Sequence, residues 1–452
     1  MKHVDAIVIG SGQGGVPLAA EFSRQGKAVV MFERSRVGGS CINWGCTPSK
    51  AFLAAAHAAG RARDAEHFGL IVKIDIDFAR VMERVRRIRD NFTEGSEQRL
   101  QRAGVTLIRK EAAFDDEGHV CAGTERFSAP LVIVDTGSSP IAPPLEGLNG
   151  VPFLTDRNFW DLEHLPKRTI ILGAGYIGLE IGQGLARLGS RVRIIDQGDR
   201  PMIREGPEVS AVLKEALETD GIRFHLAAQI DRVDYTDEVY HVQLSDNTTL
   251  EGDALLIAAG RRPNTDALNA ASAGIELDDR GCITIDERFE STRKGVYAIG
   301  EAAGQPPFTH VAWEDYRRLL GVLSGIDRSP NDRVLGYAAF TEPQLARAGF
   351  SLEEARRQGF EAISRRMEVK NMARAIEWGH RSGFYELVVD ARTDRIIGAT
   401  LVGYEAGELI HILLDLIEAE ATWRQLESAQ HIHPTYAENL PTLARMFDQD
   451  EG

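Results

Sequence analysis

Two segments of the chain share one pattern of hydrophobic and polar positions. In each, an apolar run ends in spaced glycines, an amphipathic stretch follows, and a second apolar run ends in an acidic residue. Short apolar runs followed by glycine predict buried strands, and the stretch between them has the spacing of a helix. The segments 6–33 and 170–196 therefore predict two strand-helix-strand units, each the start of a parallel sheet.

The glycines and acids of the two units occupy equivalent positions, and each acid lies 23 residues after the first glycine of its unit. The first glycine permits a tight turn, the second lets a pyrophosphate approach the backbone, and the third allows close packing. The acid accepts hydrogen bonds from ribose hydroxyls. Two dinucleotide sites in one chain suggest two cofactors that exchange electrons. The positions are Gly10, Gly12, Gly15 and Glu33 in the first unit and Gly173, Gly175, Gly178 and Asp196 in the second.

Further segments extend this organisation. The proline-rich stretch 140–152 predicts a linker between the two units. After about residue 330 the strand-then-glycine pattern stops, and alternating strands with a helix around 405–420 predict a separate α+β domain. The fold class expected is α/β, with two doubly wound, Rossmann-like domains and a C-terminal α+β domain. Other strand-then-glycine segments end at Thr136-Gly137, Gly260-Arg261 and Gly300-Glu301.

Charge and composition narrow the classes of molecule that the protein can bind. The 452 residues include 52 Lys and Arg against 67 Asp and Glu, a net charge of −15, which disfavours nucleic acid and anionic membrane surfaces. No apolar run approaches the roughly 20 residues of a membrane-spanning helix, and no targeting segment precedes the first strand. We expect a cytoplasmic protein. Its four cysteines are too few for a disulfide scaffold, so any pairing would serve chemistry.

Two cysteines, Cys41 and Cys46, lie close together in a glycine-containing segment. In a regular helix the rise between these residues alone would be about 7.5 Å, already too far for a disulfide, so a pair needs a bent backbone. Thr47 and Pro48 predict an N-cap and first position of a helix, which places Cys46 at a helix N-terminus. There the helix dipole and Lys50 favour the thiolate. Metal ligation is the competing interpretation, disfavoured because two further ligands at suitable spacing are absent nearby.

Residues 38–50, GGSCINWGCTPSK, resemble the active-site segment of the class I flavoprotein disulfide reductases, which include lipoamide dehydrogenase, glutathione reductase and mercuric reductase. The resemblance covers essentially the whole chain. It implies FAD in the first unit, a nicotinamide nucleotide in the second, and an obligate homodimer. The implied domains are FAD-binding at 1–145 and 270–330, NAD-binding at 146–269, and a dimerisation domain at 331–452.

The resemblance also implies catalytic roles. Cys41 is the interchange thiol that meets the substrate, Cys46 lies against the flavin, and Lys50 pairs with Glu180 beside it. His433, in a His-Pro-Thr segment, is the acid–base group oriented by Glu438, and this pair is expected to reach the cysteines of the other subunit. The segment 295–301 is similar to the family's second FAD motif, with Glu301 where Asp is usual.

The resemblance implies a set of cofactor contacts as well. FAD contacts are expected from Gly10, Gly12, Gly15, Glu33, Arg34, Gly39, Ser40, Lys50, Thr136, Gly137, Gly300 and Glu301. Nicotinamide nucleotide contacts are expected from Gly173, Gly175, Tyr176, Ile177, Gly178, Glu180, Asp196, Gly260 and Arg261.

The substrate is less directly indicated. His431 resembles the lipoamide dehydrogenase pattern, whereas segments 308–313 and 371–375 resemble mercuric-type reductases. The end of the chain, 447–452, has no cysteine pair, which argues against a true mercuric reductase and large thioredoxin reductases. Asp196 favours NAD over NADP, but Arg200 and Arg204 lie near it in the sequence and weaken this inference.

The resulting hypothesis is an NADH-linked dithiol–disulfide oxidoreductase, most similar to dihydrolipoamide dehydrogenase, acting on a small dithiol or a lipoyl-carrying protein. The first alternative is a metal-ion or quinone reductase of the same fold. The second is a glutathione-reductase-like enzyme or a flavin transhydrogenase.

Overall fold

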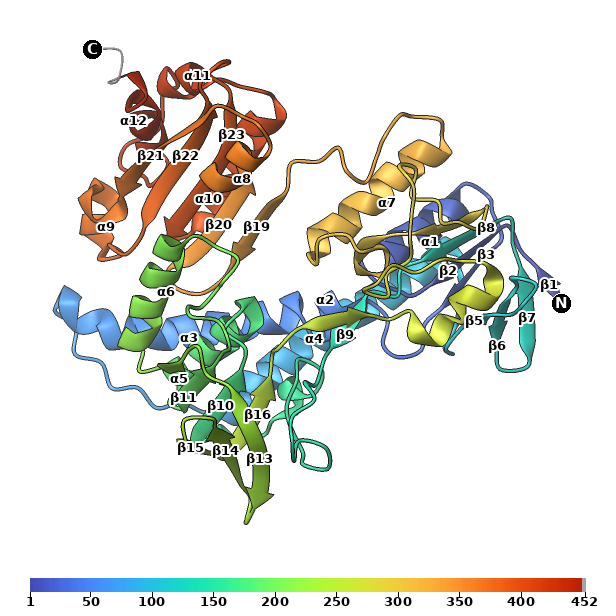
Figure 1. Cartoon of the computed structure of the whole chain (residues 1–452), viewed down its shortest axis with the longest axis horizontal. Helices are drawn as coiled ribbons and strands as arrows, with labels where there is room; N and C mark the ends of the chain where they lie inside the picture. The colour runs from blue at the N-terminus through green and yellow to red at the C-terminus, as the bar shows by residue number, and fades with distance from the viewer. Residues whose placement is uncertain (449–452) are drawn as a thin grey trace.

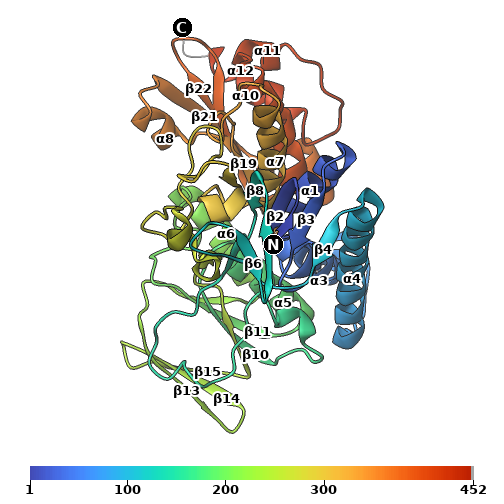
Figure 2. The ribbon, with the colours of Figure 1, turned by 90° about the vertical axis from the view of Figure 1, so that its right-hand side faces the viewer.

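The computed structural model describes residues 1–448. Most of the C-terminal segment 447–452, noted above for its lack of a cysteine pair, lies outside the described residues. The molecule consists of two nucleotide-type domains and a C-terminal domain (Figures 1 and 2). The α/β fold class is confirmed, and the three main sheets fall within the three residue ranges expected. Among the described helices, none has both the length and the apolar composition needed to cross a membrane.

The first nucleotide domain is built on a five-stranded parallel sheet. Its two strands at 6–9 and 29–32 are buried on both faces, as in parallel sheets covered by helices, which explains the unbroken apolar runs in the sequence. A small four-stranded sheet lies beside it. In spatial order the parallel strands are β18 (Val296–Ala298), β8 (Leu131–Val134), β2 (Ala6–Ile9), β3 (Val29–Phe32) and β4 (Thr106–Ile108), and the small sheet holds β1 (Lys2–His3), β7 (Glu125–Ser128), β6 (Val120–Ala122) and β5 (Ala113–Phe114). The helices are α1 (Gly15–Arg24), α2 (Gly39–Asn43), α3 (Cys46–Asp64), α4 (Phe78–Ala103) and α7 (Thr309–Leu323).

The second nucleotide domain is an insertion into the first. The chain leaves through β9 (Ser138–Pro140) and returns through β17 (Arg261–Pro263), and these two strands pair with each other. A four-stranded parallel sheet and a three-stranded antiparallel sheet form the domain. The parallel strands are β12 (Arg223–His225), β11 (Arg191–Ile195), β10 (Arg168–Leu172) and β16 (Ala254–Ile257); the others are β13 (Ile230–Thr236), β14 (Val239–Leu244) and β15 (Thr249–Gly252), and the helices are α5 (Tyr176–Leu188) and α6 (Pro207–Thr219).

The C-terminal domain is a five-stranded antiparallel sheet with helices, the α+β unit predicted. The expected helix at 405–420 is present as α10 (Ala406–Glu418). The strands in spatial order are β19 (Gly336–Ala339), β20 (Gln344–Gly349), β23 (Ile396–Gly403), β22 (Phe384–Asp390) and β21 (Ala362–Glu368); the other helices are α8 (Leu352–Arg357), α9 (Ala373–Trp378), α11 (Trp423–Glu427) and α12 (Asn439–Arg445). Short 3₁₀ helices are η1 (Ala65–Phe68), η2 (Phe159–Asp161), η3 (Asp266–Leu268), η4 (Ala270–Ala273), η5 (Gly300–Ala303) and η6 (Val369–Asn371).

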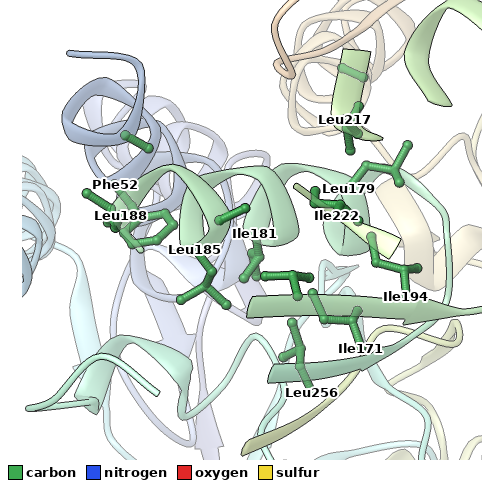
Figure 3. Packing of buried hydrophobic residues seen from close by; sticks show 14 of the residues in the cluster. Phe52, Ile171, Leu179, Ile181, Leu185, Leu188, Ile194, Leu217, Ile222 and Leu256 are labelled. Carbon is green, nitrogen blue, oxygen red and sulfur yellow. The ribbon is translucent and has the colours of Figure 1, made fainter. Parts of the chain in front are cut away.

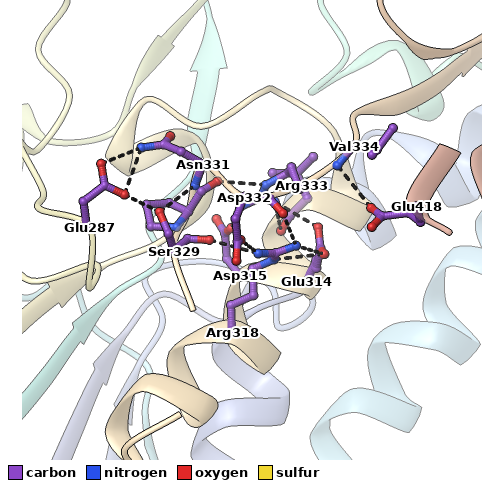
Figure 4. Close-up of polar contacts among 12 residues, drawn as sticks. Glu287, Glu314, Asp315, Arg318, Ser329, Asn331, Asp332, Arg333, Val334 and Glu418 are labelled. Carbon is purple, nitrogen blue, oxygen red and sulfur yellow. Dashed lines mark hydrogen bonds and ion pairs between the residues drawn. The ribbon is translucent and has the colours of Figure 1, made fainter. Parts of the chain in front are cut away.

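Ion pairs anchor the linker between α7 and β19 (Figure 4). Arg333 is nearly buried and pairs with Asp315, a fully buried residue of α7, and with Glu314 at 3.2 Å. Arg318 of α7 pairs with Asp332 of the linker. Buried ion pairs need well-placed partners, so these contacts fix the path of the linker rather than leaving it flexible.

The largest core cluster joins the two nucleotide domains through α3 and α5. Phe52 of α3 is fully buried beside Leu188 of α5 (Figure 3), and its ring packs edge-on against Trp160 at 6.0 Å between centroids. A Cβ atom at Gly184 of α5 would collide with the Phe52 ring. The two helices can therefore approach closely only because residue 184 has no side chain.

The start of α3 corrects one expectation. Gly45, not Thr47, occupies the N-cap position, so Cys46 is the first helical residue and the helix continues to Asp64. The Gly45 N–H donates to the Ser40 carbonyl at 2.6 Å, and this turn lets the helix begin two residues earlier than the Thr-Pro pattern predicts. Pro48 still lies in the first turn, where a missing N–H is tolerated.

We predict that Phe52→Ala lowers the free energy of unfolding by about 3–5 kcal/mol, because truncation leaves a cavity between α3 and α5. The measurement is the denaturant dependence of tryptophan fluorescence, since Trp160 packs directly on this ring. Phe350→Ala is the matched control, because Phe350 is 37% exposed and its truncation removes less buried area than truncation of the fully buried Phe52. Equal losses in the two variants would contradict the role given to Phe52.

Candidate active site

Both glycine loops have the backbone conformation that a bound pyrophosphate needs. Gly10 and Gly173, the first glycines of the two units, have φ angles of +99° and +112°. A Cβ atom at Gly10 would collide with the Asp135 carbonyl, and one at Gly173 would lie too close to the Ala258 carbonyl. Only glycine combines a positive φ with the absence of a Cβ atom, so only glycine fits at these two positions. The loops then run into the N-termini of α1 and α5, where the positive end of each helix dipole suits an anion, although the Gly15 N–H of α1 already donates to Asp135.

The two acids lie at the carboxyl ends of β3 and β11, beside their loops. Glu33 accepts hydrogen bonds from the Ser11 N–H at 3.1 Å and the Ser11 hydroxyl at 2.7 Å. Asp196 accepts from the Ala174 N–H at 2.6 Å. The equivalent geometry of the two carboxylates is the arrangement expected for binding a ribose in each domain.

Further features of the first domain fit the FAD that the family implies there. The Thr136 hydroxyl is buried with no hydrogen-bond partner among residues 1–448, so it is available to a ligand. Gly39, at the start of α2, has a φ of +63°, and a Cβ atom there would lie 2.8 Å from the Gly12 Cα. The segment 38–50, which holds Cys41 and Cys46 and is called the redox segment below, thus packs closely against the first glycine loop. Ser40 follows in α2, Gly137 has a φ of +62°, and Arg34 is exposed and paired with Glu111 at 2.7 Å.

The second predicted FAD segment, at η5, is held by polar contacts. The Gly300 N–H donates to Asp315 at 2.8 Å, and Glu301 accepts a hydrogen bond from the Ser138 hydroxyl. The guanidinium of Arg261 donates to Ser138 and pairs with Asp156 at 2.6 Å. Arg261, expected at the nicotinamide nucleotide together with Gly260, is thus placed with Glu301 at the crossover between the domains.

The two thiols of the redox segment lie within hydrogen-bonding reach of each other, and all four cysteines are unpaired in this structure. The hydrogen bond from Cys41, together with one from the Thr309 hydroxyl 3.1 Å away, lowers the pKa of the Cys46 thiol to about 6. The same Cys41–Cys46 bond and burial raise the pKa of the Cys41 thiol. At neutral pH the pair is therefore a Cys46 thiolate held by a Cys41 thiol, as the helix-terminus argument predicts.

Lys50 and Glu180 meet as expected, with Nζ 2.8 Å from Oε2. Glu180 is nearly buried and its other oxygen accepts from the Phe340 N–H at 2.9 Å, while the ammonium lies 4.5 Å from the centre of the Phe340 ring. The pair links α3 of the first domain to α5 of the second. A cation is thereby fixed one helical turn from Cys46, where it favours the thiolate.

Tyr176 and Ile177, predicted to contact the nicotinamide nucleotide, begin α5. The Tyr176 hydroxyl donates to the buried Glu205 at 3.1 Å, and its ring packs edge-on against Phe308 and Tyr337. Ile177 is partly buried against the core cluster of α3 and α5. Tyr176 is thus the one of the two with a polar contact near the loop.

His433 and Glu438 also come together, with Nδ1 2.8 Å from Oε2. The imidazole is 73% exposed, and no contact among residues 1–448 joins it to either thiol. An exposed imidazole held by a carboxylate is available to another molecule. This arrangement fits action on a second subunit.

Sequence reasoning missed two polar contacts of the site. Thr309, at the start of α7, approaches Cys46 from a segment 263 residues away. Asp135, at the end of β8, lies under the first glycine loop, and its carboxylate accepts from the Gly15 N–H at 2.6 Å. A charged residue ending a fully apolar strand was the available signal for Asp135, because such a residue faces the edge where ligands bind.

Comparisons with known proteins agree with this geometry. Residues 4–315 match the pyridine nucleotide-disulphide oxidoreductase family, and residues 336–444 match its dimerisation domain. Dihydrolipoyl dehydrogenase 2 of Haloarcula marismortui is 32% identical, over 97% of this chain and 96% of the relative. Mercuric reductase of Bacillus cereus is 31% identical, over 99% of this chain and 72% of the relative.

Among solved structures, the Cu(II) complex of the HOCl-induced flavoprotein disulfide reductase RclA from Escherichia coli superposes with a TM-score of 0.90 at 27% identity. The alignment covers 99% of this chain and 100% of that one. The dimerisation domain supports a homodimer. The chain belongs to the pyridine nucleotide-disulphide oxidoreductases, and it is an FAD-dependent disulfide oxidoreductase of the lipoamide dehydrogenase-like kind.

Proposed function

We propose that the protein oxidises a small dithiol with NAD, or reduces the corresponding disulfide with NADH, through Cys41 and Cys46, with dihydrolipoamide as the first substrate to test. The observation that supports this most directly is the pairing of a Cys46 thiolate with a Cys41 thiol. The dihydrolipoyl dehydrogenases among its relatives point the same way. FAD, when bound, carries the electron pair between the nicotinamide and the cysteine pair.

In the proposed exchange step, the Cys41–Cys46 disulfide accepts electrons from the substrate. One substrate thiolate attacks the sulfur of Cys41, a mixed disulfide forms, and Cys46 leaves as its thiolate. The second substrate thiolate then attacks the mixed disulfide at the substrate sulfur, which releases Cys41 and the oxidised substrate. A low pKa makes Cys46 the better leaving group, and this assigns Cys41 as the sulfur that meets the substrate.

Proton transfer in this step is assigned to His433 of the second subunit. Its imidazole takes the proton from the substrate thiol, and Glu438, bonded to Nδ1, stabilises the imidazolium and leaves Nε2 free to act. Lys50, held by Glu180, stabilises the Cys46 thiolate on the other side. The proposal therefore needs two subunits for each complete active site.

A cavity of about 500 Å³ supports a small-molecule substrate. It opens beside the redox segment, because Ile42, the neighbour of Cys41 in α2, lines it. Exposed rings of Phe92 and Trp313 form apolar walls, and Arg99 of α4 is the only charged residue in the lining. The complete lining is Gly12, Gln13, Val16, Pro17, Ile42, Asn91, Phe92, Gly95, Ser96, Arg99 and Trp313.

We assign NAD rather than NADP as the nicotinamide nucleotide. Asp196 is held beside the second glycine loop by the Ala174 N–H and by the Gly198 N–H at 2.7 Å, where its charge repels a 2′-phosphate. Arg200 lies nearby but donates to Asp199 at 3.1 Å and to the Ile203 carbonyl at 3.3 Å. Its guanidinium is therefore already engaged.

A second candidate is reduction of a metal ion by the same cysteine pair. Mercuric reductases are among the relatives, and the superposed RclA structure is described as a Cu(II) complex. Soft thiolates suit both Hg(II) and copper. The two candidate functions differ in one measurable property: only a metal reductase would oxidise NADH faster when the metal ion is added without a disulfide.

We predict that dihydrolipoamide, added without oxygen to the oxidised FAD-loaded protein, produces long-wavelength thiolate-to-flavin absorption and supports NAD reduction. Cys41→Ser should abolish both responses to dihydrolipoamide, because the substrate has no disulfide to attack. If Cys41→Ser still transfers hydride between nicotinamide nucleotides at the wild-type rate, that activity does not use the cysteine pair. Absorption produced by NADH but not by dihydrolipoamide, together with NADH oxidation stimulated by Cu(II), would favour the metal reductase instead.

We predict that the same absorption in the dithiol-reduced protein is lost as the pH falls through about 6, because the Cys46 thiolate exists only above its pKa. Thr309→Val should raise that midpoint, since the hydroxyl bond to the thiolate is removed while the side-chain volume is nearly kept. Thr309→Ser, which retains a hydroxyl, is the control. An unchanged midpoint in Thr309→Val would refute the role of this hydroxyl.

We predict that Arg99→Gln raises the KM for dihydrolipoate about fivefold, roughly 1 kcal/mol of an exposed charge interaction, and leaves the KM for dihydrolipoamide unchanged. The two substrates share the dithiol and differ in the carboxylate that Arg99 can bind. No ion pair engages Arg99 within the described chain, and the nearby Glu97 is paired with Arg109 at 2.7 Å. Equal changes in KM for both substrates would show that Arg99 does not bind the carboxylate.

A further inference from the structure

The carboxyl group of Asp135 occupies an unusual place beneath the first glycine loop. The residue ends β8 and is only 6% exposed. One carboxylate oxygen accepts from the Gly15 N–H at 2.6 Å, and a Cβ atom at Gly12 would lie 2.6 Å from that same oxygen. The carboxyl group thus fills the space beneath the loop that would hold the pyrophosphate of FAD.

Within residues 1–448, no ion pair with a cation is formed by this carboxyl group. The charged groups with the largest effect on it are Asp315 of α7 and Glu33 at the end of β3, both acidic, and the backbone N–H groups of Gly15 and Gly14 donate to it. Asp315 has Arg333 as a partner, whereas Arg333 is no partner of Asp135. Burial without a cation disfavours the ionised form. Burial accordingly raises the pKa of Asp135 to about 8.

Ionisation of Asp135 and binding of the pyrophosphate oppose each other for two reasons. Both are anionic, and a pyrophosphate held by the loop above Asp135 would be repelled by its carboxylate in a poorly screened environment. Both also draw on the same feature, the positive N-terminus of α1, where the Asp135 carboxylate already engages the Gly15 N–H. A neutral carboxyl group removes the repulsion and keeps the hydrogen bond.

We propose that FAD binds this protein only with Asp135 protonated, so that cofactor binding is coupled to proton uptake at alkaline pH. Below the pKa of the free protein the group is already neutral, and FAD affinity does not depend on its titration. Above that pKa each FAD molecule must bring in one proton. Asp135 is here a positioning residue of the cofactor site and takes no part in the thiol chemistry.

The test is FAD binding to the apoprotein, followed by flavin fluorescence between about pH 6 and pH 9.5. In the wild type the Kd should stay constant up to about pH 7 and then rise, approaching tenfold per pH unit above about pH 8. Asp135→Asn keeps the shape and an acceptor for the Gly15 N–H but cannot ionise, so its Kd should be flat over this range. Glu33 and Asp315 are unchanged in the variant, so the difference between the two curves belongs to Asp135. The same slope in both proteins would overturn the proposal.

A second measurement does not depend on the variant folding. Calorimetric titration of wild-type apoprotein with FAD at about pH 9, in two buffers of different ionisation enthalpy, counts the protons taken up. We expect close to one proton per FAD at about pH 9 and none at about pH 6.5. Absence of uptake at the higher pH would overturn the proposal, whatever the variant shows.

Discussion

The close packing of α3 against α5 is the constraint on which the rest of the molecule depends. These helices belong to different nucleotide domains, and the space between them admits the Phe52 ring only because Gly184 offers no side chain. The same contact brings Lys50 to Glu180. Since Cys46 begins α3, the position of the reactive sulfur is set by the interface between the two domains rather than by either one alone.

Buried carboxylates at the site are compensated in different ways. Glu180 has an ammonium partner and a backbone N–H, Asp315 has a guanidinium and a backbone N–H, and Glu205 has Arg347 at 3.1 Å and two tyrosine hydroxyls. Asp135 has backbone N–H groups and, among residues 1–448, no ion pair. The cost of burying a charge depends on such partners, so groups of one chemical type have different acidities within one protein.

Local patterns were enough to predict much of this structure. The turn at Gly10, the acid at Glu33 and the helix that begins near Cys46 depend on neighbours within about thirty residues, so their signals are contiguous in the chain. The position of Thr309 against Cys46 depends on the route of α7 through space, and no local pattern carries it. The early start of α3 likewise depends on how Gly45 turns back on α2. The contact proposed for His433 is with a second subunit, so no reading of a single chain can display it.

The insertion of one domain within another has a consequence for how the chain is made. The second nucleotide domain is a continuous segment, whereas the first needs β18 to complete its sheet beside β8. During synthesis the second domain can fold as soon as it emerges, while the edge of the first sheet stays open until residue 298 has left the ribosome. An open edge exposes unpaired backbone groups to other chains. The nascent protein is therefore most exposed to misassembly while its second domain is already complete.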